Sequence, residues 1–195
     1  MKTIQSTGVV LAIDNIDTDQ IIPAKFLKST EKSGFGKHLF ANWRYKKDGD
    51  PNPDFALNMD QHNSSILITG NNFGCGSSRE HAAWAISDYG IKAIISSQFA
   101  DIFKGNALNN DILPIALKSE DISLLMHQIT QNPKTKIEIN INQQTVKIDE
   151  SNFSFNKGFE IDPLKKKFIV EGIGDLEFLL SIQKEIETFE KSHVV

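Results

Sequence analysis

Cysteine is nearly absent from this sequence, because Cys75 is the only one among 195 residues. A single thiol excludes an internal disulfide, and it excludes a zinc or iron–sulfur site ligated by this chain's thiolates alone. No apolar run approaches the roughly 20 residues that span a membrane, and the first residues lack the apolar core of a signal peptide. We therefore expect a reduced, cytoplasmic protein without a membrane segment.

The sequence also lacks an excess of positive charge. It contains 21 Lys and Arg residues against 25 Asp and Glu residues, a formal net charge of -4. Binding to a phosphate backbone needs a basic surface, so nucleic acid is disfavoured as the main partner. With 39% hydrophobic and 24% charged residues, the composition is typical of one folded, globular domain.

Apolar, β-branched segments alternate with segments of helical periodicity between residues 8 and 129. The predicted strands are 8–13, 65–69, 93–95 and 112–117. The predicted helices are 82–89, which Gly90 would end, 99–107 and 122–129. This alternation is typical of an α/β fold with a largely parallel sheet flanked by helices.

The C-terminal third of the chain breaks this alternation. Residues 136–149 alternate apolar with polar, which predicts an added β-hairpin with one solvated face. Asp162 and Pro163 predict the start of a helix. In a final helix we expect the apolar side chains to face inward: Leu176, Leu179, Leu180 and Ile186. We find no linker or repeat, so residues 1–195 are predicted to form one domain with a C-terminal helical extension from about 162.

The most informative segment runs from Gly70 to Ala82. Three glycines in this segment, Gly70, Gly74 and Gly76, let a backbone turn tightly and approach a ligand closely. A helix is expected to begin at the serine pair that follows, where free N–H groups and the helix dipole favour an anion. Arg79 adds a guanidinium that can bind a carboxylate in bidentate fashion. The segment therefore predicts a carboxylate or phosphate site.

A purely structural interpretation of the same residues stays open. Residues 77–80 fit a capping box, in which Ser77 would stabilise the helix by about 1 kcal/mol and do no chemistry. Three glycines exceed what capping needs, and the missing lysine of a Walker motif disfavours a nucleotide. Cys75 is a weaker candidate nucleophile without an evident partner, and His81 is expected to be structural.

Several segments resemble known signatures. Residues 72–82, NFGCGSSREHA, and 17–24, DTDQIIPA, resemble the two signatures of the swivel domain of the aconitase superfamily. Residues 34–40, with Trp43 and Arg44, resemble the bacterial type of the 3-isopropylmalate dehydratase small-subunit family. Residues 99–103 and 109–114 match the same family. The resemblance implies a swivelling β/β/α-type domain.

The resemblance further implies a hydro-lyase of leucine biosynthesis, which converts 2-isopropylmalate to 3-isopropylmalate through 2-isopropylmaleate. It implies that this chain binds no cofactor or metal, and that it works only with a large subunit carrying a [4Fe–4S] cluster. Ser77 would be the catalytic base and Arg79 would hold the carboxylate of a dicarboxylate substrate. Thr18, Asp19 and Ser78 would line the same cleft.

The resemblance places substrate discrimination in the segment after Pro23. Phe26 and Leu27 suit an alkyl group, whereas Lys25 and Lys28 leave a wider substrate range open. A related dehydratase acting on homoaconitate, citraconate or dimethylmalate is therefore an alternative. A non-catalytic carboxylate-binding domain is another alternative, and a neighbouring large-subunit gene would favour the enzyme.

Overall fold

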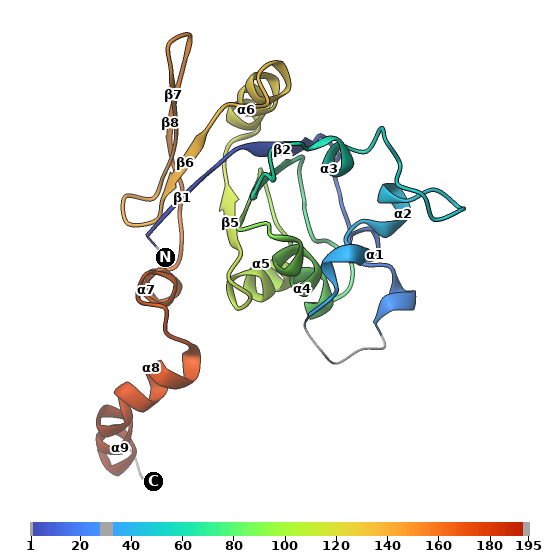
Figure 1. Ribbon diagram of the computed structural model, residues 1–195. Helices are drawn as coiled ribbons and strands as arrows, with labels where there is room; N and C mark the ends of the chain where they lie inside the picture. The colour runs from blue at the N-terminus through green and yellow to red at the C-terminus, as the bar shows by residue number, and fades with distance from the viewer. Residues whose placement is uncertain (1, 28–32, 193–195) are drawn as a thin grey trace.

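The computed structural model describes residues 2–27 and 33–192, which form two four-stranded sheets and the helices around them (Figure 1). One sheet is parallel, in the order β2 (Gly8–Leu11), β3 (Ile66–Thr69), β4 (Ala93–Ser96) and β5 (Leu113–Ala116). The other is antiparallel, in the order β1 (Thr3–Ser6), β6 (Ile137–Asn140), β7 (Thr145–Glu150) and β8 (Phe153–Gly158). No helix in the described ranges is long and apolar enough to cross a membrane.

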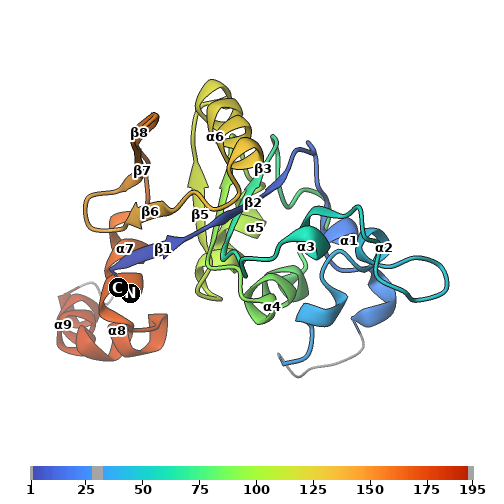
Figure 2. The same cartoon turned by 45° about the horizontal axis from the view of Figure 1, so that its top comes forward.

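The parallel sheet is the middle layer of the molecule (Figure 2). Its strands are mainly apolar because both faces are covered, and all four residues of Ile66–Thr69 are buried. One face packs against α1 (Thr18–Ile21), α4 (Glu80–Tyr89) and α5 (Asp101–Leu108). The other face packs against α6 (Ser119–Gln131) and the antiparallel sheet. The predicted largely parallel, helix-flanked α/β fold is therefore confirmed.

The antiparallel sheet contains the predicted hairpin and two further strands, β1 and β8. Strands β6 and β7 pair as expected, and inward residues such as Ile139 and Val146 alternate with more exposed ones. Strand β1 extends this hairpin on one side, with Thr3 opposite Asn140, and β8 extends it on the other. The sequence did not predict β1 and β8, because neither has an apolar run long enough to indicate a strand on its own.

The segment after α1 crosses the helical face in short pieces. These pieces are η1 (Ala24–Phe26), η2 (Gly36–His38), α2 (Ala41–Arg44) and α3 (Ala56–Met59). The backbone N–H of Gly36 donates to Asp88 Oδ2 over 2.7 Å, and a side chain at Gly36 would meet the backbone of α4 at 2.7 Å. The Arg44 guanidinium donates to the carbonyl of Gly36 over 3.0 Å and lies over the Tyr89 ring. These contacts hold the segment against the end of α4.

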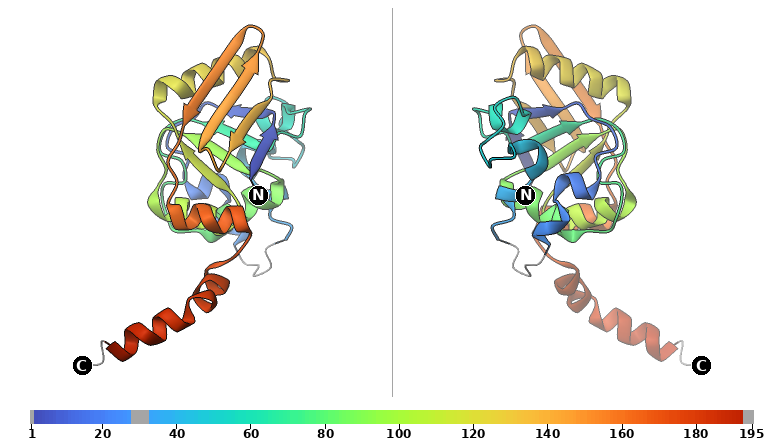
Figure 3. Two further views of the ribbon diagram at one scale, coloured as in Figure 1. Left: turned by 90° about the vertical axis from the view of Figure 1, so that its left-hand side faces the viewer. Right: turned by 90° about the vertical axis from the view of Figure 1, so that its right-hand side faces the viewer.

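The C-terminal region begins as predicted and then departs from the prediction. Asp162 caps α7 (Pro163–Glu171) by accepting a hydrogen bond from the Lys165 N–H. Two helices follow, α8 (Asp175–Ser181) and α9 (Gln183–Ser192), and they extend away from the two sheets (Figure 3). The expectation that their apolar residues face inward is wrong, because all four are exposed: Leu176, Leu179, Leu180 and Ile186. Helical periodicity identifies an apolar face but not what covers it.

Candidate active site

The loops that follow strands β2, β3 and β4 meet at the carboxyl ends of the parallel sheet, the usual position of ligands in α/β proteins. The Gly74 N–H donates to the Ile16 carbonyl over 2.7 Å, and the Thr18 N–H donates to the Cys75 carbonyl over 2.9 Å. The Phe73 N–H donates to the Gln98 carbonyl over 3.0 Å. These backbone bonds connect the three loops into one rigid layer.

The glycine-rich turn needs glycine for both conformation and space. Gly74 and Gly76 have φ values of +76° and +90°, in the left-handed region that favours glycine. A Cβ atom at Gly74 would lie 2.6 Å from Cβ of Phe103, so a side chain would also displace α5. The predicted tight turn is confirmed.

The predicted capping box does not form. Helix α4 begins at Glu80, and its N-cap is Arg79, whose side chain makes no capping hydrogen bond. Ser77 therefore lies two residues before the cap, where its Oγ is 3.4 Å from Thr18 Oγ1. Thr18 Oγ1 also donates to the Ser77 carbonyl over 3.0 Å. The loop from β2, not the helix, positions Ser77.

Arg79 connects the same two loops by charge. Its Nη1 forms an ion pair with Asp19 Oδ1, where the arginine side chain is 20% exposed and the aspartate side chain 57%. The hydrogen bond from Arg79 is the main cause that lowers the pKa of Asp19 below its usual value. Arg79 is thus held in one orientation by Asp19, as a residue that binds a carboxylate needs to be.

A pocket of about 240 Å³ opens beside these residues. Four of the predicted site residues line it: Thr18, Ser77, Ser78 and Arg79. Asp19 reaches it through the ion pair with Arg79. Phe26 and Leu27 do not line it; they pack, half-buried, against the core, and Phe26 stacks on His38 at 3.8 Å. Lys28 lies outside the described residues.

Three residues of α5 that the sequence did not indicate also line the pocket: Asp101, Ile102 and Asn106. Asp101 adds a carboxylate, and Ile102 adds an apolar side chain that is 59% exposed. Asp101 and Ile102 belong to the segment 99–103, so the resemblance had marked this stretch without giving it a function. These residues are separated from the glycine-rich turn in the sequence, and the folding of the parallel sheet brings α5 beside the turn. No local sequence pattern therefore indicates them.

Cys75, the single thiol of the chain, is partly buried in the turn. Burial is the main cause that raises the pKa of the Cys75 thiol, with the nearby Asp17 carboxylate as a second cause. A raised pKa disfavours the thiolate, so Cys75 is a poor nucleophile. Within residues 2–27 and 33–192, no three His, Cys, Asp or Glu side chains are grouped to hold a metal ion.

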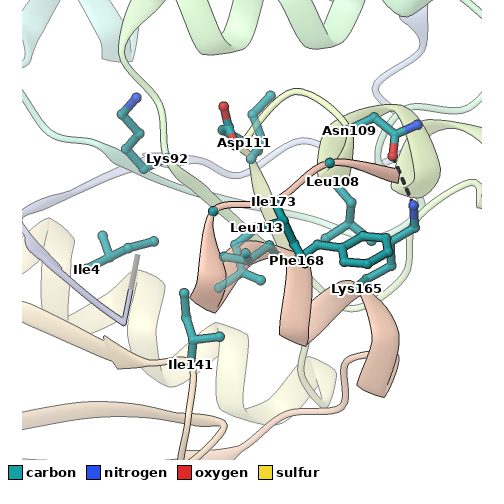
Figure 4. A pocket seen from close by; sticks show the side chains of 14 residues that line it. Ile4, Lys92, Leu108, Asn109, Asp111, Leu113, Ile141, Lys165, Phe168 and Ile173 are labelled. Atoms are coloured by element: carbon teal, nitrogen blue, oxygen red, sulfur yellow. Dashed lines mark hydrogen bonds between the residues drawn. The ribbon is translucent and has the colours of Figure 1, made fainter. Parts of the chain in front are cut away.

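A larger cavity of about 460 Å³ lies at the opposite, amino ends of strands β4 and β5 (Figure 4). Its wall is mainly apolar, with Lys92 and Lys165 among the lining residues. Lys165 donates to Asn109 Oδ1 over 3.2 Å, and α7 closes one side of the cavity. This cavity contains none of the predicted site residues, so size alone does not identify the active site.

The parallel sheet has α1, α4 and α5 on one face, α6 and the antiparallel sheet on the other, and a glycine-rich turn at its strand ends. Residues 1–120 match the family model of the aconitase C-terminal domain, and this match gives the class of the protein. The fold class predicted from the sequence is therefore confirmed.

Comparison with similar proteins identifies the family within this class. The chain is 55% identical to the 3-isopropylmalate dehydratase small subunit of Karelsulcia muelleri, over 98% of this chain and 96% of that protein. It is 52% identical to the small subunit of Christiangramia forsetii, over 97% and 91%. The crystal structure of 3-isopropylmalate dehydratase from Methanocaldococcus jannaschii is similar, with a TM-score of 0.68 and 28% identity, over 96% of this chain and 99% of that one. The chain belongs to the family of 3-isopropylmalate dehydratase small subunits.

Proposed function

We propose that the chain is the small subunit of a 3-isopropylmalate dehydratase, the hydro-lyase that isomerises 2-isopropylmalate to 3-isopropylmalate through 2-isopropylmaleate in leucine biosynthesis. A small subunit implies a large-subunit partner. The observation that carries the site assignment is the convergence of Ser77, Thr18 and Arg79 on one pocket at the strand ends. A hydroxyl and a guanidinium at this spacing suit a substrate that has a proton next to a carboxylate.

Ser77 takes that proton from the substrate carbon in this proposal. A free serine hydroxyl is too weak an acid to be ionised at neutral pH, so its oxyanion needs stabilisation. The backbone N–H groups of Ser77 and Ser78 donate no hydrogen bond within the described chain, and they precede the positive end of α4. Thr18 Oγ1, 3.4 Å from Ser77 Oγ, orients the hydroxyl.

Arg79 holds the substrate carboxylate beside that carbon. A carboxylate is the group that Arg79 already binds, since Asp19 occupies it as an ion pair. A substrate carboxylate would share the guanidinium with Asp19 or replace it, at the edge of the pocket where Asp19 is solvent-exposed. The same positive charge stabilises the negative charge that develops on the carboxylate as the proton leaves.

The substrate's isopropyl group needs an apolar wall. Phe26, Leu27 and Lys28 remain the proposed specificity segment, on the resemblance alone. Ile102 is a second candidate, because it lies in the same pocket as Ser77 and exposes its side chain there. Both proposals require the substrate to lie between this chain and its partner.

The departing hydroxyl group would leave to a Lewis acid, and this chain's thiolates alone cannot ligate an iron–sulfur cluster for that purpose, because it has one cysteine. We place a [4Fe–4S] cluster on the large subunit, where it would supply that Lewis acid. The residues of this chain then do the remaining work: Ser77 moves the proton and Arg79 holds the carboxylate. Water returns to the neighbouring carbon to complete the isomerisation.

Reconstitution tests the proposal. The purified chain should be folded and colourless and should not interconvert the two isopropylmalates. Mixed anaerobically with its large subunit, it should restore turnover, measured by the absorbance of the unsaturated intermediate. Turnover by the chain alone would contradict the proposal, as would a tight complex that carries an intact cluster but is inactive.

A further inference from the structure

The last two helices expose several large apolar residues. On α8, the side chains of Leu176, Leu179 and Leu180 are 69%, 50% and 61% exposed. Residues spaced by three and four positions lie on the same side of a helix. On α9, Ile186 is 36% exposed, and no residue of this helix is buried. We call α8 and α9 the C-terminal arm.

The arm packs against α7. Phe178 packs against Phe168 of α7, with ring centroids 5.3 Å apart, and the residues around Gly172 and Gly174 connect the helices. Figures 1 and 3 show the arm leading away from both sheets. The connecting residues border the large cavity of Figure 4, but the exposed leucines do not line it. The fold itself therefore leaves the leucine face uncovered.

This arrangement is costly for an isolated chain. Helices of 7 and 10 residues are marginally stable in water unless an apolar face is covered. Each exposed leucine forgoes the free energy of burial, about 25 cal/mol per Å² of apolar surface. An apolar face of this kind marks an interaction site.

Charge decides between a second copy and a different partner. The arm, residues 175–192, carries one aspartate, four glutamates and two lysines, a formal net charge of -3. Two copies of this chain meeting through their arms would bring two such faces together and repel each other. A different protein can present an apolar groove with a basic rim, which fits both the leucines and the glutamates.

We propose that the C-terminal arm docks on the large subunit, with Leu176, Leu179 and Leu180 as its anchoring side chains. This inference rests on the proposed function, because that function supplies the partner. It separates two tasks within one chain: the arm contributes to association, and the strand-end pocket does the chemistry.

Binding of the full-length chain to the cluster-loaded large subunit tests the proposal. The double variant Leu176→Ser/Leu180→Ser should raise Kd by about 30-fold or more, the effect expected of hot-spot residues. Leu124→Ser is the matched control, because Leu124 is an exposed leucine of α6 outside the arm. It should leave Kd unchanged. At saturating large subunit, the double variant should keep its kcat, whereas failure of the proposed function would show as inactivity of a wild-type complex that forms normally.

Hydrogen exchange on the wild-type chain provides an independent test that needs no variant. Amides of α8 and α9 should exchange rapidly in the free chain and become protected when the large subunit is added. Unchanged exchange in the arm, or an unchanged Kd in the double variant, would overturn the proposal. It would also be overturned if the free wild-type chain were a dimer that the double variant converts to a monomer, since the arm would then bind a second copy.

Discussion

A serine that acts as a base depends on its neighbours more than on its own chemistry. Ser77 does not cap α4, so the helix does not need its hydroxyl. Its hydroxyl instead faces Thr18 and opens to the pocket that Arg79 also lines. The Ser77 hydroxyl is not needed to hold the two loops together, since the Thr18 hydroxyl already donates a hydrogen bond to the backbone carbonyl of Ser77. The side chain of Ser77 is thus available for catalysis.

Substitutions can distinguish Ser77 from Asp101, the carboxylate in the same pocket, as the catalytic base. Ser77→Ala should lower kcat by about 100- to 10,000-fold, the usual contribution of a general base. It should change the free energy of unfolding by no more than about 1 kcal/mol, because only one weak hydroxyl contact is lost. Asp101→Asn removes the carboxylate in the same pocket and should keep kcat within about tenfold. The reverse ranking of the two variants would make Asp101 the base.

Arg79 gives a second prediction. Arg79→Lys keeps the positive charge but loses the planar pair of donors that fits a carboxylate. One hydrogen bond to a charged group is worth about 1.5–3 kcal/mol, so kcat/KM should fall by about 10- to 100-fold. Every substrate that has this carboxylate should be affected alike. A selective loss, confined to isopropylmalate, would place Arg79 against the variable group instead.

The sequence predicted these residues because their motif is local. The segment from Gly70 to Arg79 is continuous in the chain, so its glycines, serines and guanidinium are visible together. The contact between Thr18 and Ser77 spans 59 positions, and only the resemblance brought these two residues into one cleft. Ile102 is further along the chain still, and no local pattern indicates that it faces the turn.

At the scale of elements, loops that follow parallel strands assemble the pocket. Strands of four buried residues, such as β3 and β4, were predicted well because they are mainly apolar and both of their faces are covered. Strand β1, with the sequence TIQS, was not, because its partner β6 lies more than 130 residues away. Local propensity cannot indicate a strand whose stability comes from such distant pairing.

Two elements compete as the apolar wall for the isopropyl group, and substitutions can distinguish them. We expect Ile102→Ala on α5 and Leu27→Ala after η1 each to lower the kcat/KM ratio of isopropylmalate to a methyl-bearing analogue by roughly 10- to 200-fold. Ile13→Ala, at an exposed isoleucine that does not line the pocket, is the control. An unchanged ratio in Leu27→Ala would remove the segment after Pro23 from specificity. If the kcat/KM ratio is unchanged in Ile102→Ala, the Ile102 side chain does not contact the isopropyl group and would instead contact the partner.

At the scale of the whole molecule, two regions with different tasks lie on one scaffold. The pocket occupies the carboxyl ends of the parallel sheet, whereas the large cavity and the connection to the C-terminal arm lie near the amino ends of β4 and β5. The exposed face of the arm could not be predicted, because an amphipathic helix has the same sequence pattern whether it covers its own core or another protein. The scaffold between these regions must be rigid for the pocket to keep its geometry.

Gly74 tests that rigidity, because it lies where the loops after β2 and β3 bond to each other and where α5 packs against them. Gly74→Ala combines a positive φ with a collision against Phe103 and should cost about 2–4 kcal/mol. For a chain of this length, that loss lowers Tm by about 5–15 °C. Gly49→Ala is the matched control: its φ is +94°, but open space surrounds it, so it should cost only about 1 kcal/mol. Calorimetry should show one transition for each variant, with a clearly lower Tm for Gly74→Ala. Equal shifts in the two variants would mean that backbone conformation alone, and not the packing of α5 against the turn, makes glycine necessary at Gly74.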